Sequence, residues 1–436
     1  MSTLKKKDRK SINLDWKIFI PSILISIIGV LTLVSTELSI SGQVEDWDIV
    51  VKQLIFVGLG IVLSILISKL DLSYLKHWQI ILIIYILTII LLLVTLFFGP
   101  VINNVRRWII VGGVQIQPAE IAKVTVILTT ALVFSMKDRY NEWVLFLVSF
   151  LLVLPIFLLI YLQPSGSMSL LILGLWFVVA FTGLGNQLRN FLLLAIVGCI
   201  SIGIFFLSVT GNHLWLLLSG AGLFLSVMCF YARDVWRGFV IGSVILGFVI
   251  GVGGNFAWNN VLHEYQKERV EAFVFPEETQ EDIGFNVAQS KIAIGSGQIW
   301  GKGYGNGTQS KRNFLPEHQT DFIFASFAEE FGLVGSILLL FLYAFLIVEI
   351  FLVAMKYFDN VFFSMMAVGI GFKVLFEIFI NIGTNTGVIP ATGIPLPLMS
   401  AGGSITVMTF ISLGLIQAIK NSSKEKIVTD SFVDIS

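Results

Sequence analysis

Long apolar segments recur along this chain from residue 17 to residue 419, and they constrain its fold more than any other feature. About 20 consecutive apolar residues form a helix long enough to cross the hydrocarbon core of a bilayer. The 436 residues are 56% hydrophobic and only 13% charged, whereas a soluble domain carries about 25% charged residues. The sequence therefore predicts an all-α, polytopic integral membrane protein.

We expect about twelve membrane-spanning helices. Their predicted positions are 17–36, 50–68, 79–98, 119–135, 143–161, 169–184, 191–208, 214–231, 239–256, 327–355, 361–380 and 403–419. The 191–231 region is compatible with one hairpin or with a less regular arrangement. The polar segments between these helices divide the chain into a basic N-terminal segment (1–16), nine helices (17–256), a large loop (257–326), three helices (327–419) and a tail (420–436).

The distribution of Lys and Arg predicts that both termini are cytoplasmic. Basic residues are enriched in cytoplasmic loops, and five of them precede the first span. The loops at 37–49, 162–168, 209–213 and 381–402 fall on the opposite face and contain no Lys or Arg. Two segments on that outside face are exceptions, because the loop after the third span carries Arg106 and Arg107 and the large loop carries six cations.

Several classes of site are not supported by composition. The formal net charge is zero, so no nucleic-acid partner is implied. Cys199 and Cys229 lie in apolar runs and are expected to act as small hydrophobic residues. The four histidines show no metal-ligand spacing. No cleavage site follows the first apolar run, which we interpret as a retained span.

Asp321 is the leading candidate for chemistry. It lies directly before the apolar run 322–325, with no basic residue beside it in sequence. Desolvation from one side would raise the pKa of this carboxyl and make it a better general base near neutral pH. The alternative is a helix cap, for which Thr320 and Asp321 are equally suitable residues.

Other ionisable residues occur in close pairs within the predicted spans. These pairs are Glu120 with Lys123, Lys373 with Glu377, and Glu329 beside Glu330. Ionisable groups within a membrane are candidates for function, but residues three or four apart on a helix can also neutralise each other. The adjacent glutamates open a span, where the helix dipole favours acids.

Two outside segments are rich in glycine or proline. The run GSGQIWGKGYGNG contains Lys302, and its turn amides suit either phosphate binding or an ordinary surface turn. It lacks the order of a nucleotide P-loop. In GTNTGVIPATGIPLPLMSAGGS, Pro390, Pro395 and Pro397 prevent a continuous helix. This segment is expected to line an outward-facing cavity or to form a plain interfacial loop.

Taken in order, NNVRRWI, IQPAEIAK, SKIAIGSGQIWGKGYGNGTQSKRNFLPEHQTDFIFASFAEEFGLVG and TGVIPATGIPLPLMSAGGS resemble the signatures of the RodA/FtsW/SpoVE (SEDS) family, closest to its RodA branch. The resemblance runs from about residue 17 to 420. It implies a ten-helix core, so two spans around 191–231 would be additional. It also implies a peptidoglycan glycosyltransferase that polymerises lipid II on the outer face of the bacterial cytoplasmic membrane, beside a class B penicillin-binding protein.

The resemblance assigns roles to individual residues. The essential acid of the family falls on Asp321, as catalytic base. The substrate-binding residues that we predict are Trp108, Arg106, Arg107, Lys123, Glu120, Lys302, Arg312, Gln309 and Ser400. Cations on the outside face would stabilise the charge that develops on the leaving undecaprenyl pyrophosphate. No cofactor is certain, and a divalent cation (Mg or Mn) is left open, as is a role in elongation, cell shape or division.

One motif departs from the family. An acid usually follows the Gln-Pro of the QPDLGT motif, but this chain has QPSGSM at 163–168. This departure favours a non-catalytic scaffold of the cell-wall synthesis complex as one alternative to the enzyme. A lipid II flippase is another, because it would use the same cavity and intramembrane charges. Polymer formation in detergent distinguishes the enzyme from a flippase, because a flippase needs a bilayer. Dependence on Asp321 distinguishes the enzyme from a scaffold.

Overall fold

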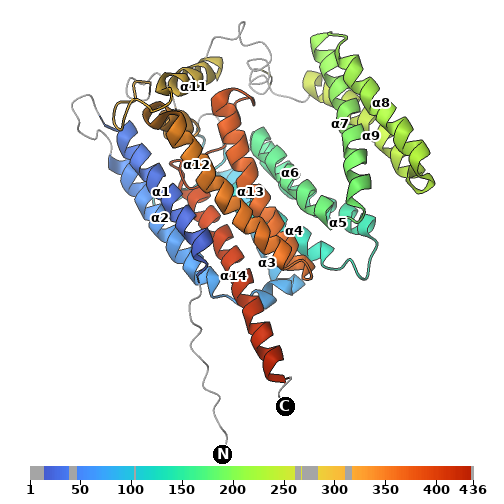
Figure 1. The fold of residues 1–436 in the computed structure, drawn as a ribbon, viewed down its shortest axis with the longest axis horizontal. Coiled ribbons are helices and arrows are strands. Elements are labelled where there is room, and N and C mark those ends of the chain that lie inside the picture. The colour runs from blue at the N-terminus through green and yellow to red at the C-terminus, as the bar shows by residue number, and fades with distance from the viewer. Residues whose placement is uncertain are drawn as a thin grey trace, which may run out of the picture. The chain divides into compact units, whose positions relative to one another are not determined.

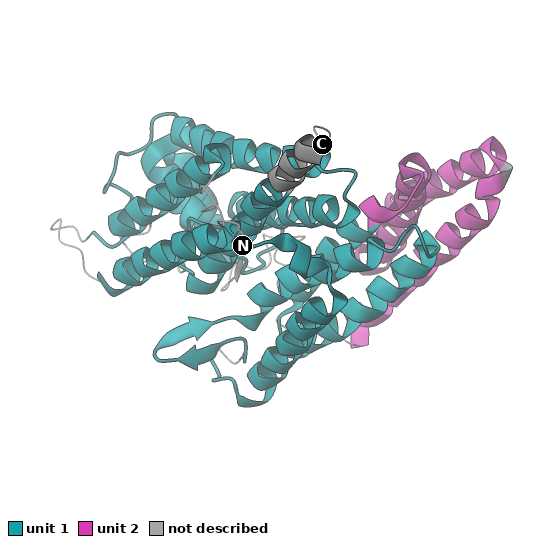
Figure 2. Ribbon diagram, turned by 90° about the horizontal axis from the view of Figure 1, so that it is seen from below, with its two compact units in different colours: residues 1–180, 275–436 teal, residues 181–274 magenta. Residues whose placement is uncertain are grey.

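The computed structural model of the protein describes residues 14–38, 47–102, 105–260, 267, 283–309 and 317–433. It divides into two compact units, residues 1–180 with 275–436 and residues 181–274 (Figure 2). Eleven helices in the described ranges are long and apolar enough to cross a membrane. The prediction of an all-α polytopic membrane protein is confirmed.

The elements follow the chain in the order shown in Figure 1. They are α1 (Trp16–Thr36), α2 (Trp47–Ser68), η1 (Leu72–Lys76), α3 (Trp78–Phe98), β1 (Ile109–Val111), β2 (Val114–Ile116), α4 (Pro118–Phe134), α5 (Glu142–Leu162), α6 (Gly166–Gly183), α7 (Gln187–Thr210), α8 (Trp215–Ala232), η2 (Asp234–Trp236), α9 (Arg237–Asn260), α11 (Ile283–Gly297), α12 (Ile323–Lys356), α13 (Val361–Thr386) and α14 (Gly403–Val433).

The twelve ranges predicted from the sequence correspond to the eleven long helices and to α4. Helix α4 has only 17 residues and is buried along nearly its whole length, because it packs against α3, α5 and α13. Two boundaries differ from the prediction. Helix α12 begins at Ile323 rather than at 327, and α14 continues beyond 419 to Val433, so that much of the expected tail is helical.

Polar contacts at the two ends of α1 define the ends of the first unit. At one end Asp15 forms an ion pair with Lys420, and its amide donates to Gln417 of α14. At the other end Ser35 donates to Glu330 of α12 at 2.5 Å. We call the second end, where α1 and α3 finish and α4, α12 and α14 begin, the Asp321 end.

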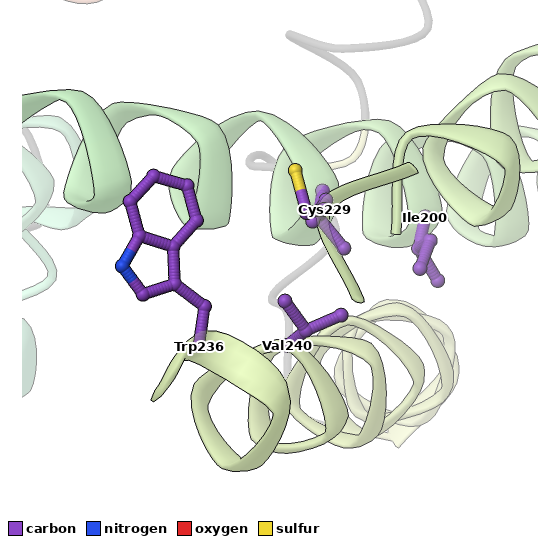
Figure 3. Packing of buried hydrophobic residues seen from close by; sticks show 5 residues of the cluster. Ile200, Cys229, Trp236 and Val240 are labelled. Carbon is purple, nitrogen blue, oxygen red and sulfur yellow. The ribbon is translucent and has the colours of Figure 1, made fainter. Parts of the chain in front are cut away.

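The second unit is a bundle of α7, α8 and α9. Its core consists of Ile196, Ile200, Cys229, Trp236 and Val240 (Figure 3). Cys229 is 5% exposed and both cysteines are free thiols, as expected for small hydrophobic residues. The 191–231 region forms an ordinary helical hairpin, α7 and α8.

Helix α12 breaks at Gly332, whose φ of 65° and ψ of −162° lie in a region almost restricted to glycine. The break frees main-chain groups that need hydrogen-bond partners within the membrane protein. The glycine-rich segment 298–303 supplies them. The amides of Lys302 and Gly303 donate to the carbonyls of Glu329 and Glu330, and the carbonyls of Gln298 and Ile299 accept from Leu333 and Val334.

We expect Gly332→Ala to destabilise the protein strongly. A Cβ at this position would clash with the amide nitrogen of Gly301, which lies 2.3 Å away. The main-chain conformation would add strain of about 1–3 kcal/mol for alanine. Gly295→Ala on α11 is the control, because a Cβ there meets no atom within 4 Å. Thermal unfolding in detergent should show a lower midpoint for the first variant alone, and equal midpoints would contradict the role given to the break.

A candidate active site around Asp321

Asp321 lies in a turn that two asparagine side chains hold in place. The side-chain amides of Asn381 and Asn385, one turn apart on α13, each donate to the main-chain carbonyl of Asp321 at 2.9 Å. The Oδ1 of Asn385 also accepts from the amide of Ala325 at 3.1 Å, in the first turn of α12. Both asparagines are at most 1% exposed, so the turn before α12 is fixed from inside the bundle.

The non-helical segment 387–402 holds the same turn from a second direction. Ser400 is fully buried, accepts from the amide of Leu396 and donates to the carbonyl of Thr320 at 2.6 Å. The amide of Ala401 donates to the carbonyl of Gln319 at 2.8 Å. Its second half, residues 394–400, is almost wholly buried, as Leu396 at 0% exposure shows, and this burial does not fit a plain interfacial loop.

A strained residue lies in this segment. Leu398 has a φ of 68°, in the left-handed region that branched side chains rarely adopt. The hydroxyl of Tyr343 donates to the neighbouring carbonyl of Pro397 at 2.7 Å, and the main chain of Met399 packs directly against Gly29. Such a strained conformation persists only where the surrounding contacts hold the residue in place, and it is common at functional sites.

Asp321 is not the N-cap residue of α12. The N-cap is Phe322, whose own side chain makes no capping hydrogen bond. Asp321 is half-buried, and its Oδ2 lies 3.5 Å from the position that a Cβ on Gly393 would occupy. Phe322 and Ala325 pack against Ala293 of α11, which makes the surroundings of the acid apolar on one side.

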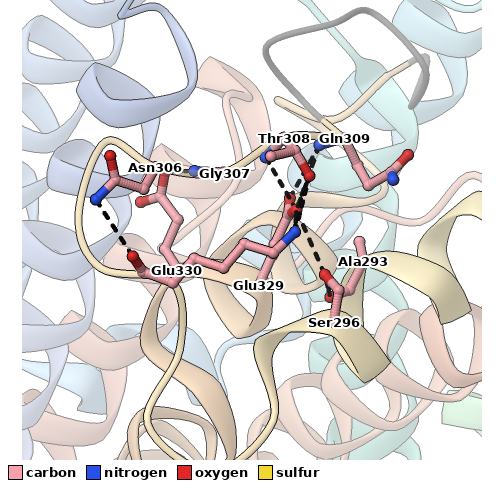
Figure 4. A network of polar contacts seen from close by, with 9 residues as sticks. Ala293, Ser296, Asn306, Gly307, Thr308, Gln309, Glu329 and Glu330 are labelled. Carbon is pink, nitrogen blue, oxygen red and sulfur yellow. Dashed lines mark hydrogen bonds and ion pairs between the residues drawn. The ribbon is translucent and has the colours of Figure 1, made fainter.

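Glu329 and Glu330 form a buried anchor for the loop 302–309, drawn in Figure 4. Glu329 is fully buried and its Oε1 contacts the Nζ of Lys302 at 2.5 Å. The same oxygen accepts from the amide and the hydroxyl of Thr308 at 2.9 and 2.7 Å. Glu330 is 1% exposed and accepts from Ser35, whose hydroxyl oxygen accepts in turn from the amide of Gly305 at 2.9 Å.

The amides of this loop are therefore directed at carboxylates of the protein itself. The amide of Gln309 donates to Glu329 at 3.2 Å, and the charge of Lys302 is balanced by the same residue. Burial raises the pKa of the neighbouring Tyr304 phenol, and the negative charge of Glu330 raises it further. These contacts anchor Lys302 and Gln309 to Glu329, and their role in substrate binding stays a prediction.

The two charged pairs of α4 and α13 join into one network. Lys123 contacts Glu120 at 2.7 Å and forms a second, very close ion pair with Glu377, which also accepts from Lys373 at 3.0 Å. All four side chains are at most 1% exposed. Lys373 donates further to Thr409 of α14 at 3.2 Å. Two cations and two anions thus compensate each other between α4 and α13.

The predicted residues of the first outside loop lie near the end of α3. Arg106 is exposed and donates to the carbonyl of Phe97 at 3.1 Å. Arg107 is half-buried and donates to the carbonyl of Pro164, within the motif that lacks the usual acid. Trp108 is half-buried. Arg312 lies outside the described residues.

Among the residues that the structure describes, no three His, Cys, Asp or Glu side chains converge as a metal cage. A divalent cation therefore stays a prediction. Mg²⁺ is commonly held by one or two carboxylates together with substrate phosphates.

Sequence reasoning missed Asn381, Asn385 and Ser35. All three are polar residues buried within apolar helices, which is the signal that could have found them. Their partners lie 60 or more residues away in sequence, so their function in the fold is visible only in the structure.

Fold and site together define a multi-pass α-helical membrane protein with an acidic site at the edge of its helical bundle. The family model of the FtsW, RodA and SpoVE cell cycle proteins matches residues 15–219 and 217–425. The chain belongs to this family, as its motifs predicted.

Individual relatives agree. The chain is 32% identical over 393 residues to the peptidoglycan glycosyltransferase MrdB of Escherichia coli (strain K12), covering 88% of this chain and 89% of that protein. It is 30% identical to the peptidoglycan glycosyltransferase RodA of Treponema pallidum, covering 93% and 97%. It is 31% identical to the probable peptidoglycan glycosyltransferase FtsW of Lactococcus lactis, covering 95% and 93%.

Solved structures show the same fold. A chain from a peptidoglycan synthase complex, described as coordinating polymerization and crosslinking, matches with a TM-score of 0.67 at 24% identity, covering 94% of this chain and 98% of that one. The rod shape determining protein RodA of Thermus thermophilus matches with a TM-score of 0.58 at 23% identity, with the same coverage.

We expect the Lys302–Glu329 pair to act in stability. Lys302→Met should lower the free energy of unfolding by roughly 2–4 kcal/mol, because the buried carboxylate of Glu329 loses its cation. Glu329→Gln should lower it less, because the Lys302 side chain is 27% exposed. The double variant should lose less than the sum, because the two residues are coupled. Lys52→Met is the control, since its pair with Asp48 is exposed and worth little.

Thermal or chemical unfolding in detergent measures these differences. Additive losses would contradict the coupling. A Lys302→Met protein with unchanged stability but a higher KM for substrate would instead show that Lys302 contacts substrate directly.

Proposed function

We propose that Asp321 is the general base with which this peptidoglycan glycosyltransferase polymerises lipid II into β-1,4-linked glycan strands. The observation that carries the proposal is the turn at Asp321. Three buried side chains, Asn381, Asn385 and Ser400, hold the main chain of the turn at Thr320 and Asp321, just before α12 begins. A catalytic group must be held in place by its surroundings, which is what this arrangement provides.

The reaction needs one acid. The 4-hydroxyl of the acceptor sugar attacks the anomeric carbon of the donor, and its proton passes to the Asp321 carboxylate. The new bond joins the acceptor oxygen to that carbon, while the bond to the phosphate oxygen breaks and undecaprenyl pyrophosphate leaves. A single displacement inverts the anomeric centre. Pyrophosphate leaves without a proton donor, so the second carboxyl that glycosidases use is unnecessary.

Negative charge that develops on the pyrophosphate requires cations at the membrane surface. We assign this role to Arg106 and Arg107, with Arg312 as a further candidate from the large loop. Lys123 and Lys302 are compensated by buried carboxylates, so we assign them, with Glu120 and Gln309, to positioning the helices and the loop. A divalent ion, where bound, would add positive charge at the same phosphates.

The proposed setting is the bacterial cytoplasmic membrane, with both termini in the cytoplasm and the Asp321 end outside. The absence of Lys and Arg from four loops on that face supports this orientation. A class B penicillin-binding protein is the proposed partner. The complex of polymerization and crosslinking to which one structural neighbour belongs supports it. The flippase and the scaffold are not favoured, because the curated relatives are named as glycosyltransferases.

Asp321→Asn and Asp321→Ala should lower the rate of glycan polymerisation by about 10²–10⁴-fold, which is the contribution expected of a general base. Purified lipid II, the purified protein and its cognate penicillin-binding partner are incubated in detergent, and product length is read on gels. Both variants should keep the wild-type unfolding midpoint and bind the partner.

Glu317→Gln is the matched control for this experiment. Glu317 lies four residues earlier on the same turn, and its exposed carboxylate accepts from the hydroxyl of Thr320 at 2.9 Å. We expect it to polymerise at nearly the wild-type rate. Polymerisation by the Asp321 variants together with loss in Glu317→Gln would transfer the role of base to Glu317.

A further inference from the structure

We propose that the β1–β2 hairpin inserts its apolar face into the outer membrane interface and thereby holds residues 106–108 at the level of the lipid headgroups. The insertion stands on the geometry of the hairpin alone. Its consequence for catalysis rests on the proposed function, because it concerns a substrate that is anchored in the same leaflet.

The hairpin presents apolar side chains that the described part of the protein leaves uncovered. Val111 pairs with Val114 across the strands, and Ile109 pairs with Ile116. Directly opposed residues project from the same face of a hairpin, so these four side chains share one face. Val111 is 59% exposed, Val114 39% and Ile116 38%. A two-stranded hairpin alone is marginally stable in water, and it needs an apolar surface against this face.

The position of the hairpin identifies that surface as lipid. It follows α3, a membrane-spanning helix that ends in Phe97 and Phe98, which are 64% and 83% exposed. It is also tied to the start of α14, another span. The amide of Gln117 donates to the hydroxyl of Ser404 at 2.9 Å, and that hydroxyl donates to the carbonyl of Gln115 at 3.2 Å. Both attachments lie at the ends of helices that are long and apolar enough to span a membrane.

The depth of insertion is limited by hydrogen bonding. The outer edges of both strands carry main-chain groups that would be unsatisfied in hydrocarbon. The hairpin therefore lies in the interface, where apolar side chains reach the acyl chains and polar groups stay hydrated. Arg106 and Trp108 at its base suit this level, since cations and tryptophans are typical of the interface. The bond from Arg106 to the carbonyl of Phe97 ties the cation to the end of α3.

Depth-dependent quenching tests the insertion without reference to activity. Single cysteines at Val111, Leu87 and Asn306 are introduced into the full chain with Cys199→Ser and Cys229→Ala, and are labelled with an environment-sensitive fluorophore. Leu87 is an exposed position in the middle of α3, and Asn306 is an exposed polar position in the loop 302–309. The proteins are reconstituted in phosphatidylcholine–phosphatidylglycerol vesicles containing lipids brominated near the top or near the end of the acyl chains.

We expect the label at Val111 to be quenched most by shallow bromine, the label at Leu87 most by deep bromine, and the label at Asn306 least by both. A Val111 label quenched no more than that at Asn306 would overturn the proposal. Quenching that disappears when the penicillin-binding partner is added would overturn it as well, because the face would then belong to a protein interface.

A second experiment measures polymerisation by variants whose substitutions keep the hairpin folded. Val111→Thr with Val114→Thr retains β-branched side chains and makes the face polar, whereas Val111→Ile with Val114→Ile keeps it apolar. In vesicles the threonine variant should show a KM for lipid II about tenfold higher with kcat nearly unchanged, which is a loss of about 1.4 kcal/mol in substrate binding. The isoleucine variant should match the wild type.

These experiments distinguish failure of the hairpin's role in substrate positioning from failure of the proposed function. If the Val111 label is quenched but the threonine variant polymerises normally, the hairpin is inserted and its link to substrate positioning is wrong. If the wild type itself makes no polymer, the proposed function fails while the quenching result stands.

Discussion

Main-chain groups that leave helical geometry at membrane depth must find hydrogen-bond partners inside the protein, and the Asp321 end of this structure depends on meeting that requirement. The break at Gly332 exposes the carbonyls of Glu329 and Glu330, and the loop from Gln298 to Gly303 pairs with them. The non-helical segment 387–402 meets the same requirement through Ser400 and Tyr343. The glycines of the first segment and the prolines of the second are thus explained by the contacts that they permit.

The charged residues divide into two groups by burial. Glu120, Lys123, Lys373, Glu377 and Glu329 are at most 1% exposed and are paired within the protein. Buried pairs of this kind contribute little net stability but make the loss of either partner costly, so they specify how α4, α13 and the loop 302–309 fit together. The ionisable residues outside this network include Asp321, Arg106 and Arg107, which are half-buried or exposed at the membrane edge.

This division bears on how one acid could serve as a base while its neighbours do not. Glu329 and Glu330 are close to Asp321 in sequence, yet each is enclosed by donors from the loop and from Ser35. The main chain of Asp321 is held by Asn381 and Asn385. Its carboxylate is therefore positioned by a rigid peptide, which is the arrangement that a proposed general base needs.

The sequence by itself determined the class, the spans and the family of this protein. Apolar runs of about 20 residues can satisfy their own main chain only as helices in a bilayer, and motifs such as FLPEHQTDFIFA are long enough to identify a family. The start of α12 was predicted four residues late, because hydropathy does not report that 323–326 pack against α11.

Only the tertiary structure showed which partners the buried polar residues have. From local spacing alone, Asp321 could cap a helix, Lys302 could bind phosphate, and the charged pairs of α4 and α13 could be separate. The partners that the structure adds lie between 27 and 254 residues away, such as Glu329 for Lys302 and Glu377 for Lys123. Sequence periodicity carries information about neighbours on one helix, whereas the compensation of a buried charge depends on whatever side chain the fold brings beside it.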